Sequence, residues 1–228
     1  NLNGCKNLET LNLGNWDELE SVIMDKCTQL KKITAYTNPN LKTWDLSNNV
    51  NLTTFESNDG GLEELLLPKS IVNVICRKNN FSSITLEDYK DLTVFDCMDN
   101  KELTSLSLTG CEKLYALKFS KTQIESFNFS GFTNLSVIDC GNTKLTAVDV
   151  SANTSLGNLY CDSLGLTNLD ITHNTQLLAL SCAGNELNAL DVTKNKAFRQ
   201  LNISDNNFDK DALNTVFTAL PPFTATLS

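Results

Sequence analysis

Apolar residues recur along the whole chain in the phrase L-x-x-L-x-(L/C)-x-x-N-x-L, with mainly polar residues between them. The phrase opens ten times at spacings of 19 to 22 residues, at Leu8, Leu30, Leu52, Ile71, Leu92, Leu114, Leu135, Leu156, Leu177 and Phe198. A period in this range is typical of a solenoid, in which each repeat buries its apolar face only against its neighbours. The pattern therefore predicts one elongated repeat domain.

Each repeat has two similar halves, with apolar residues at positions i, i+3 and i+5. In the repeat that opens at Leu135 these are Leu135, Ile138 and Cys140, followed by Leu145, Val148 and Val150. The last two members of each half alternate as in a short strand, and neither half is long enough for an amphipathic helix. We therefore expect a parallel sheet from the first halves, a looser ladder from the second halves and little helix.

One repeat breaks this pattern. The repeat from Leu52 has only 19 residues and contains Leu65-Leu66-Leu67-Pro68. Proline has no N–H to donate to a strand ladder. We expect a kink or an altered loop there.

The C-terminal segment has a different period. Between Ala212 and Leu220 the apolar residues Leu213, Val216, Phe217 and Leu220 fall on one helical stripe, with acidic residues before it and Pro221-Pro222 after it. This predicts a helix that caps the last repeat, and residues 223–228 could supply one more strand. A helix that binds a membrane or a partner is the alternative, but its polar face has no Lys/Arg cluster.

We interpret residues 1–228 as a single domain. Residues 2–8 follow the plan of residues 24–30, so residues 1–7 look like the remnant of an upstream repeat. Residues 8–206 are the ten repeats, and residues 207–228 are the C-terminal cap. A chain that begins within a repeat leaves any leader, anchor or N-terminal cap outside view.

The phrase matches the leucine-rich-repeat consensus along essentially the whole chain. The version Leu145-Thr-Ala-Val-Asp-Val-Ser-Ala-Asn-Thr-Ser-Leu156, echoed at Leu166 and Leu187, resembles repeats of bacterial cell-surface and secreted, internalin-like proteins. The resemblance implies a β-rich solenoid, a right-handed superhelix of about ten rungs with a parallel sheet on the concave face and a C-terminal capping helix. It also implies that a macromolecular partner is held on the concave face.

The eight cysteines are in register with the repeat. Cys76, Cys97, Cys140, Cys161 and Cys182 hold its sixth position, and Cys5, Cys27 and Cys111 lie three residues before the next opening residue. Hydrophobic residues or Asn replace them in other repeats, so the thiols are expected to be free and buried. Neighbouring rungs lie in disulfide range but with parallel Cβ vectors, which suit a disulfide poorly. A metal site along the column is disfavoured, because a ladder spreads its ligands apart.

Charge and motifs narrow the function classes. The chain carries 18 basic and 27 acidic residues, a net charge of −9, which argues against nucleic acid as partner. Its apolar runs are too short for membrane insertion by this segment. No metalloprotease, nucleophile-elbow, phosphate-loop or dinucleotide motif occurs, and the one histidine, His173, falls at a predicted turn. We expect no enzyme, no cofactor and no metal.

Residues that alternate with the inward positions of the first halves face outward on the sheet. In the middle of the array these combine apolar groups with carboxylates, as partner patches do. The alternative is that strand propensity alone favours Val, Ile and Tyr there. The candidate partner-binding residues are Ile75, Val94, Asp96, Met98, Val137, Asp139, Tyr160 and Asp162.

A second column contains Asp149, Asp170 and Asp191, each with Ser or Thr two residues later. Clustered carboxylates can bind calcium. No Asp-x-Asp-x-Asp loop accompanies them, so we interpret them as turn residues that bond the local backbone.

Together these observations predict a non-catalytic binding module, a monomer that recognises a protein or glycan partner. The resemblance implies a bacterial protein on the cell surface, anchored in the outer membrane or secreted. The rival interpretation is a structural spacer that presents another domain of a longer surface protein.

Overall fold

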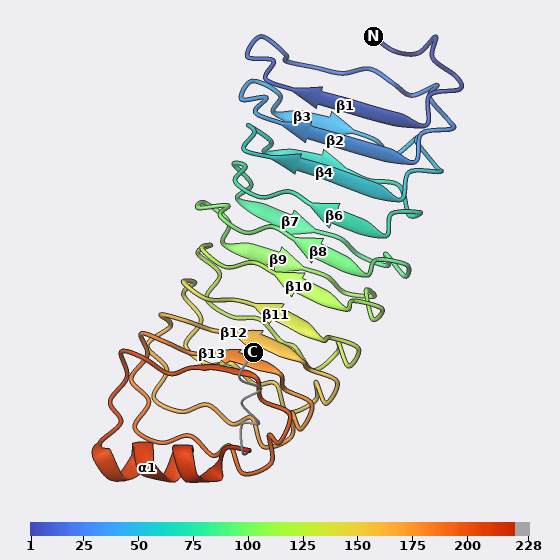
Figure 1. The fold of residues 1–228 in the computed structure, drawn as a ribbon. Coiled ribbons are helices and arrows are strands. Elements are labelled where there is room, and N and C mark those ends of the chain that lie inside the picture. Colours follow the sequence, from blue (N-terminus) through green and yellow to red (C-terminus); the bar gives the residue numbers. More distant parts are fainter. Residues whose placement is uncertain (222–228) are drawn as a thin grey trace, which may run out of the picture. The chain divides into compact units, whose positions relative to one another are not determined.

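The computed structural model describes residues 1–221, and these form a parallel-sheet β-solenoid with a C-terminal helix (Figure 1). The structure divides into two compact units, Asn1–Glu125 (unit 1) and Ser126–Ser228 (unit 2). The expected strand at residues 223–228 lies outside the described residues.

In unit 1 the first half of every repeat forms a strand of one parallel sheet. Its strands are β1 (Thr10–Gly14), β2 (Lys32–Tyr36), β4 (Thr54–Asn58), β6 (Asn73–Ile75), β8 (Val94–Asp96) and β10 (Ala116–Lys118). Each strand begins at the third position of its repeat, and the register pairs Ile33 with Phe55 and Phe95 with Leu117. The predicted parallel sheet and its register are confirmed.

The second halves of unit 1 form what we call its outer wall. The wall contains two separate parallel pairs, β3 (Thr43–Asp45) with β5 (Glu64–Leu66) and β7 (Ser83–Thr85) with β9 (Ser105–Ser107). Among residues 1–125 no strand pairing joins β5 to β7. The break lies in the 19-residue repeat with Pro68, where a kink or altered loop is predicted.

Unit 2 contains the parallel strands β11 (Val137–Asp139), β12 (Asn158–Tyr160), β13 (Ala179–Ser181) and β14 (Gln200–Asn202), and the helix α1 (Lys210–Ala219). The second halves of its described repeats contain turns in place of strands. Three of these turns are those predicted from Asp149, Asp170 and Asp191. The Asp149 carboxylate accepts bonds from the Ser151 N–H (3.0 Å) and hydroxyl (2.7 Å), and Asp170 does so from Thr172, which confirms the turn interpretation.

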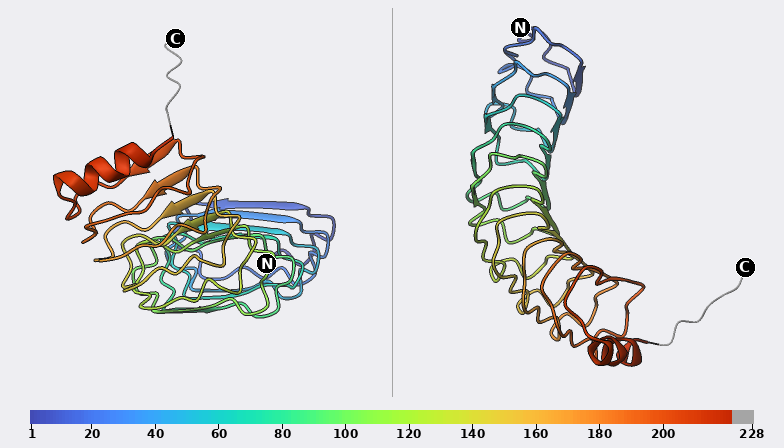
Figure 2. Two further views of the ribbon diagram at one scale, coloured as in Figure 1. Left: turned by 90° about the horizontal axis from the view of Figure 1, so that it is seen from below. Right: turned by 90° about the vertical axis from the view of Figure 1, so that its left-hand side faces the viewer.

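The helix α1 lies beside the last turn of unit 2 (Figures 1 and 2). The Asp209 carboxylate accepts a bond from the Ala212 N–H at 2.8 Å and so caps the helix N-terminus. Val216 is buried as predicted. Phe217 is 56% exposed, contrary to the predicted stripe, because the buried side of the helix is centred on Val216 and Phe217 lies at its edge.

The core of both units is built from columns of apolar side chains, one per turn. In the centre of unit 1 Phe55, Val74 and Phe95 are fully buried, and in unit 2 Ile138 and Leu159 are fully buried. The sixth-position cysteines extend these columns. All eight cysteines are free and seven are buried, as predicted; Cys5 is exposed, contrary to the prediction.

Buried asparagines connect successive turns within each unit. In unit 1 the Asn100 amide donates to the Cys76 carbonyl (2.9 Å) and the Cys97 carbonyl (2.8 Å). In unit 2 the Asn185 amide donates in the same way to Cys161 (3.0 Å) and Cys182 (2.9 Å). These bonds satisfy carbonyls that the chain buries at its turns.

Candidate functional site on the sheet face

The outward side of the strands, which we call the sheet face, carries the eight candidate residues. Ile75, Val94, Asp96 and Met98 belong to unit 1, and Val137, Asp139, Tyr160 and Asp162 belong to unit 2. Seven of the eight are half-buried, as expected for side chains that lean on neighbours of the same face. Asp96 is the exception.

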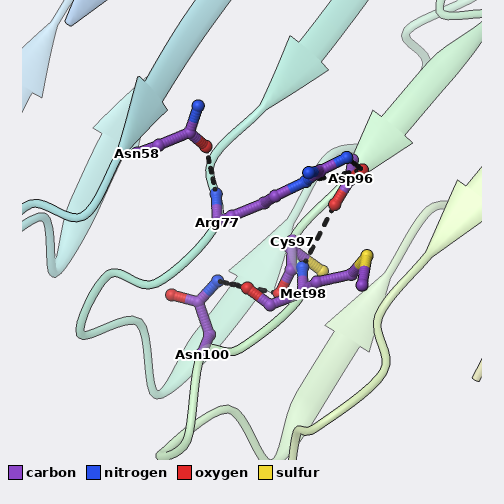
Figure 3. A network of polar contacts seen from close by, with 6 residues as sticks. All are labelled: Asn58, Arg77, Asp96, Cys97, Met98 and Asn100. Atoms are coloured by element: carbon purple, nitrogen blue, oxygen red, sulfur yellow. Dashed lines mark hydrogen bonds and ion pairs between the residues drawn. The ribbon is translucent and has the colours of Figure 1, made fainter. Parts of the chain in front are cut away.

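In unit 1 the Asp96 carboxylate is only 2% exposed because the Arg77 side chain covers it (Figure 3). Arg77 Nε and Nη2 donate to Asp96 Oδ2 at 3.0 and 2.6 Å. The Met98 N–H donates to Asp96 Oδ1 at 3.3 Å. Asp96 is therefore not an accessible carboxylate, and the partner-facing group at this place is the guanidinium of Arg77, whose side chain is 44% exposed.

Backbone bonds fix the base of this pair. The Arg77 N–H donates to the Asn58 side chain at 3.0 Å, one strand away (Figure 3). On the next turn Asn100 holds the Cys97 carbonyl, directly after Asp96. Both ends of the Arg77–Asp96 pair are thus attached to strands β4 to β8, so the guanidinium is presented in one orientation.

Half-buried apolar side chains surround the pair. Ile75 lies opposite Asp96 in the register of β6 and β8, and Val94 lies opposite Asn73. Met98 follows β8 and is half-buried. A charged group set among apolar side chains is the composition that interface centres favour, where Arg and Met are enriched.

The neighbouring strands of unit 1 carry a second, weaker ion pair. Lys32 Nζ lies 3.3 Å from Glu56 Oε1, and both side chains are partly exposed. Exposed pairs of this kind contribute at most about 1 kcal/mol to stability. The pair mainly makes the face polar toward β2.

In unit 2 Asp162 is likewise committed to local bonds. Its Oδ1 accepts from the Ser181 hydroxyl (2.6 Å) and from the Ala183 N–H (2.7 Å). Gly141 lies beside it, and a Cβ there would come within 3.0 Å of the Asp162 nitrogen. The side chain of Asp162 therefore organises the end of the sheet face, whereas Tyr160 and Val137 offer contact surface.

Tyr160 also lines an open groove of about 810 Å³ at the end of unit 2. Its other walls include Arg199 and Gln200 before and within β14, and Phe217 and Leu220 at the cap. Sequence reasoning missed this groove, because it depends on how α1 packs against β14. The one signal was Phe217, an aromatic residue on a helix otherwise read as a plain cap.

The buried thiols behind the sheet face are expected to be unreactive. Burial raises the pKa of Cys76 and Cys97 in unit 1 and of Cys140 and Cys161 in unit 2. Burial also raises the pKa of Cys182 to about 12. At neutral pH these groups remain protonated thiols and act as small core residues.

Other chemistry has little support in the described residues. Within residues 1–221 no group of three or more His, Cys, Asp and Glu side chains is arranged to hold a metal ion. His173 is exposed at its turn, where its ring nitrogen lies 3.5 Å from the Thr172 hydroxyl. In the part of the chain that the structure describes, no helix combines the length and apolarity needed to span a membrane.

The fold is that of leucine-rich-repeat proteins, internalins among them. A chain of the LRIM1/APL1C complex aligns with a TM-score of 0.75 at 18% identity, over 96% of this chain and 48% of that one. An internalin, InlF from Listeria monocytogenes, aligns with a TM-score of 0.59 at 17% identity, over 85% of this chain and 66% of that one.

A chain of the Drosophila Toll–Spatzle complex aligns with a TM-score of 0.62 at 14% identity, over 88% of this chain and 35% of that one. This chain spans less than two thirds of each of these three structures. No protein-family model matches the sequence, and a search of curated proteins finds no match. The identities are low, so the likeness establishes the leucine-rich-repeat fold alone.

Proposed function

We propose that this chain is a non-catalytic binding module that holds a protein partner on its sheet face. The observation that carries the proposal is the Arg77–Asp96 pair of unit 1, set among Ile75, Val94 and Met98. A buried carboxylate aims a half-exposed guanidinium outward, and apolar side chains surround it.

This arrangement favours binding for a physical reason. An unrestrained Arg side chain loses rotamer entropy when it is immobilised at an interface, at a cost of about 0.5–1.5 kcal/mol. Here Asp96 holds the guanidinium, and the Asn58 side chain of β4 holds the Arg77 backbone, before a partner arrives. Arg77 is thus preorganised, and the apolar side chains beside it supply surface that excludes water around it.

Unit 2 offers its own contact surface. Tyr160 and Val137 are half-buried apolar groups on β12 and β11, and Asp139 stands opposite Tyr160 in the strand register. Tyrosine combines a large apolar ring with a polar hydroxyl, which explains its enrichment at interfaces. We propose Tyr160 as the anchor of unit 2.

The similar structures support a protein as the partner class. The LRIM1/APL1C and Toll–Spatzle chains come from complexes with other proteins. The likeness to an internalin, together with the sequence resemblance, supports our proposal that this is a bacterial surface or secreted protein. A glycan partner and an inert spacer are the outcomes that an experiment must separate from it.

The test compares capture by variants of each unit with capture by the wild type. Ile75→Lys/Met98→Lys alters unit 1, Tyr160→Ala alters unit 2, and Glu102→Lys is the matched control at an exposed turn off the sheet face. Envelope and host-surface extracts are offered to each chain, and bound proteins are quantified by mass spectrometry. We expect a partner whose capture falls at least tenfold with the unit 1 variant, equivalent to about 1.4 kcal/mol, and remains with the control.

Other results would contradict the proposal. A spacer retains whatever it binds in all three variants. A glycan ligand is revealed by loss of capture after the extracts are deglycosylated, with the protein component left intact. Circular dichroism and urea titration of each variant show whether its fold is preserved.

A further inference from the structure

The charges on the sheet face of unit 1 do not cancel. The third, fifth and seventh positions of its repeats hold three cations, Lys32, Arg77 and Lys118, and two carboxylates, Glu56 and Asp96. Lys32 pairs with Glu56 at 3.3 Å, and Arg77 pairs with Asp96 at 2.6 Å. The face therefore keeps one positive charge, at Lys118, although the whole chain has a net charge of −9.

Lys118 stands directly beside the Arg77–Asp96 pair. In the register of β8 and β10 it lies opposite Asp96. The Arg77 guanidinium reaches the Asp96 carboxylate with two nitrogens, so it lies over β8, one strand from Lys118 (Figure 3). Neighbouring strands are about 4.8 Å apart, so one ligand group can reach both cations.

Lys118 has no counter-ion in its own unit. Within residues 1–125 no carboxylate lies within ion-pair distance of its ammonium group. The Asp96 carboxylate is turned to Arg77 and accepts from the Met98 N–H at 3.3 Å. Lys118 is half-buried, as expected for a side chain whose stem lies on the sheet while its charged end stays in water.

Apolar side chains border the two cations. Ile75 lies on the other side of Asp96 in the strand register, and Val94 lies on the same strand as Asp96. Met98 follows β8, and all three apolar side chains are half-buried. A ligand group placed here therefore meets positive charge and apolar surface together.

The size of the charge excess favours one kind of ligand group. Guanidinium and ammonium groups both donate charge-assisted hydrogen bonds to carboxylate oxygens. One excess positive charge is neutralised by one carboxylate, whereas a phosphate monoester brings about two negative charges. A cationic group would meet like charge and be rejected.

We propose that the protein partner places an Asp or Glu side chain between Arg77 and Lys118, with an apolar residue beside it on Ile75, Val94 and Met98. The inference rests on the proposed function and names the partner chemistry of its unit 1 site. Asp96 stays paired with Arg77 and orients it, and the incoming carboxylate neutralises the remaining charge of the face. Binding of this kind weakens as salt screens the charges.

The probes are three blocked tripeptides, Leu-Glu-Leu, Leu-Gln-Leu and Leu-Lys-Leu, and inorganic phosphate. Each is titrated into the full chain, and NMR follows the Arg77 Nε–H signal and the Lys118 amide. We expect the Glu peptide to shift both signals with a millimolar dissociation constant and to bind at least about threefold more tightly than the Gln peptide. Its affinity should fall as salt rises from about 0.05 to 0.5 M.

Two variants and a control locate the binding. Lys118→Gln removes the excess charge and leaves the Arg77–Asp96 pair, and we expect it to weaken the Glu peptide about three- to tenfold. Lys118→Glu should invert the preference, so that the Lys peptide binds more tightly than the Glu peptide. Lys113→Gln removes the same charge off the sheet face, where Lys113 is 62% exposed, and should change each affinity by less than about twofold.

The proposal is wrong if the Gln peptide binds as well as the Glu peptide, or if phosphate shifts the two signals and the Glu peptide does not. It is also wrong if the Glu peptide does not bind at about 20 mM.

Capture from extracts separates this inference from the proposed function. If Ile75→Lys/Met98→Lys abolishes capture of a protein and Lys118→Glu does not, the binding module stands and the carboxylate anchor is wrong. If no variant changes capture, the proposed function fails, and the peptide titration decides the carboxylate site by itself.

Discussion

The outer walls of the two units use the same position of the repeat in different ways. Three residues before each opening residue, unit 2 has Asn153, Asn174 and Asn195 on successive turns, each buried and each bonded to carbonyls of the turn before. Unit 1 has Cys5, Cys27, Asn49, Pro68, Tyr89 and Cys111 at that position, and before Leu135 unit 2 has Phe132. In unit 2, Val148, Leu169 and Leu190 of the outer wall are buried. Unit 1 instead has an opening between β5 and β7, the wall slot, which Leu65, Cys76 and Ile84 line.

Residues at this position differ in how many carbonyls of the preceding turn they can hydrogen-bond. A buried Asn satisfies two carbonyls at once, so its turn can close without strand pairing. A Cys or Tyr satisfies one, and Pro satisfies none. Unit 1 replaces part of these missing hydrogen bonds by the strand pairs β3–β5 and β7–β9. The opening lies between β5 and β7, where there is neither an Asn of this column nor a strand pair.

The largest expected effect concerns this column. Asn174→Ala removes two buried bonds, to the Val150 and Asn153 carbonyls, which keep only their backbone bonds from the Asn153 and Leu156 N–H groups, and we expect a loss of about 2 kcal/mol in the free energy of unfolding. Cys111→Ala removes only one weak bond, from Sγ to the Leu86 carbonyl at 3.4 Å, and should cost about 1 kcal/mol. Urea denaturation of both variants tests this, and equal losses would remove the distinction between the columns.

The second prediction compares access to two buried thiols. Cys76 lines the wall slot and Cys161 lies in the closed core of unit 2, although burial raises the pKa of both. With iodoacetamide under native conditions we expect exposed Cys5 to react first and Cys76 at least ten times faster than Cys161, because opening near the slot exposes less core. Peptide mass spectrometry measures the rates, and equal rates for Cys76 and Cys161 would show a closed slot.

The third prediction concerns pH. Hydrogen bonds from Ser151 lower the pKa of Asp149, those from Thr172 lower the pKa of Asp170, and those from Thr193 lower the pKa of Asp191. A lowered pKa in the folded state stabilises the fold above the unfolded value of about 3.9, and this stabilisation is lost as pH falls through that value toward the folded pKa.

Unit 1 has one such turn, at Asp45 and Ser47. Acidification below about pH 4 should therefore reduce amide protection in unit 2 before unit 1. Amide exchange by NMR between neutral pH and about pH 3 tests this order. Replacing the three unit 2 carboxylates by Asn should flatten its pH profile, and Asp45→Asn serves as the unit 1 control.

The smallest effect concerns the eighth position of the repeat, which is left-handed in every turn described. Thr37 holds it in unit 1 at φ 52° and Gly184 in unit 2 at φ 66°. Thr37→Gly should stabilise by up to about 1 kcal/mol, and Gly184→Thr should destabilise by about 1–2 kcal/mol. Thermal unfolding measures both, and changes of the same sign would mean that the turn relaxes around its residue.

The sequence predicted the front strands closely because the same side-chain spacing is repeated ten times. The opening residue fixes which residues point inward, and each strand begins two residues later. The turn at Asp149 was also readable, since its bonds span only two residues. Both features depend on local pattern.

What the sequence did not show depends on contacts between turns. Arg77 and Asp96 are 19 residues apart, and only the register of β6 and β8 shows that the guanidinium covers the carboxylate. To predict the wall slot from the sequence, one would need to know how the chain is arranged after Leu67. To predict the exposure of Phe217, one would need to know the orientation of α1. The left-handed conformation of the eighth position was not predicted. Asn, Asp and Gly, which favour it, occupy this position in most repeats, but Thr37, Lys78 and Lys121 occupy it in others.

The buried asparagine column of unit 2 has a direction. Asn174 donates to Asn153, and Asn195 donates to Asn174, so every amide reaches toward the turn that precedes it in the chain. During synthesis the acceptors of each new coil are therefore already in place when its donor leaves the ribosome. Growth from the N-terminal side needs no rearrangement of earlier coils, and the order of translation becomes the order of assembly.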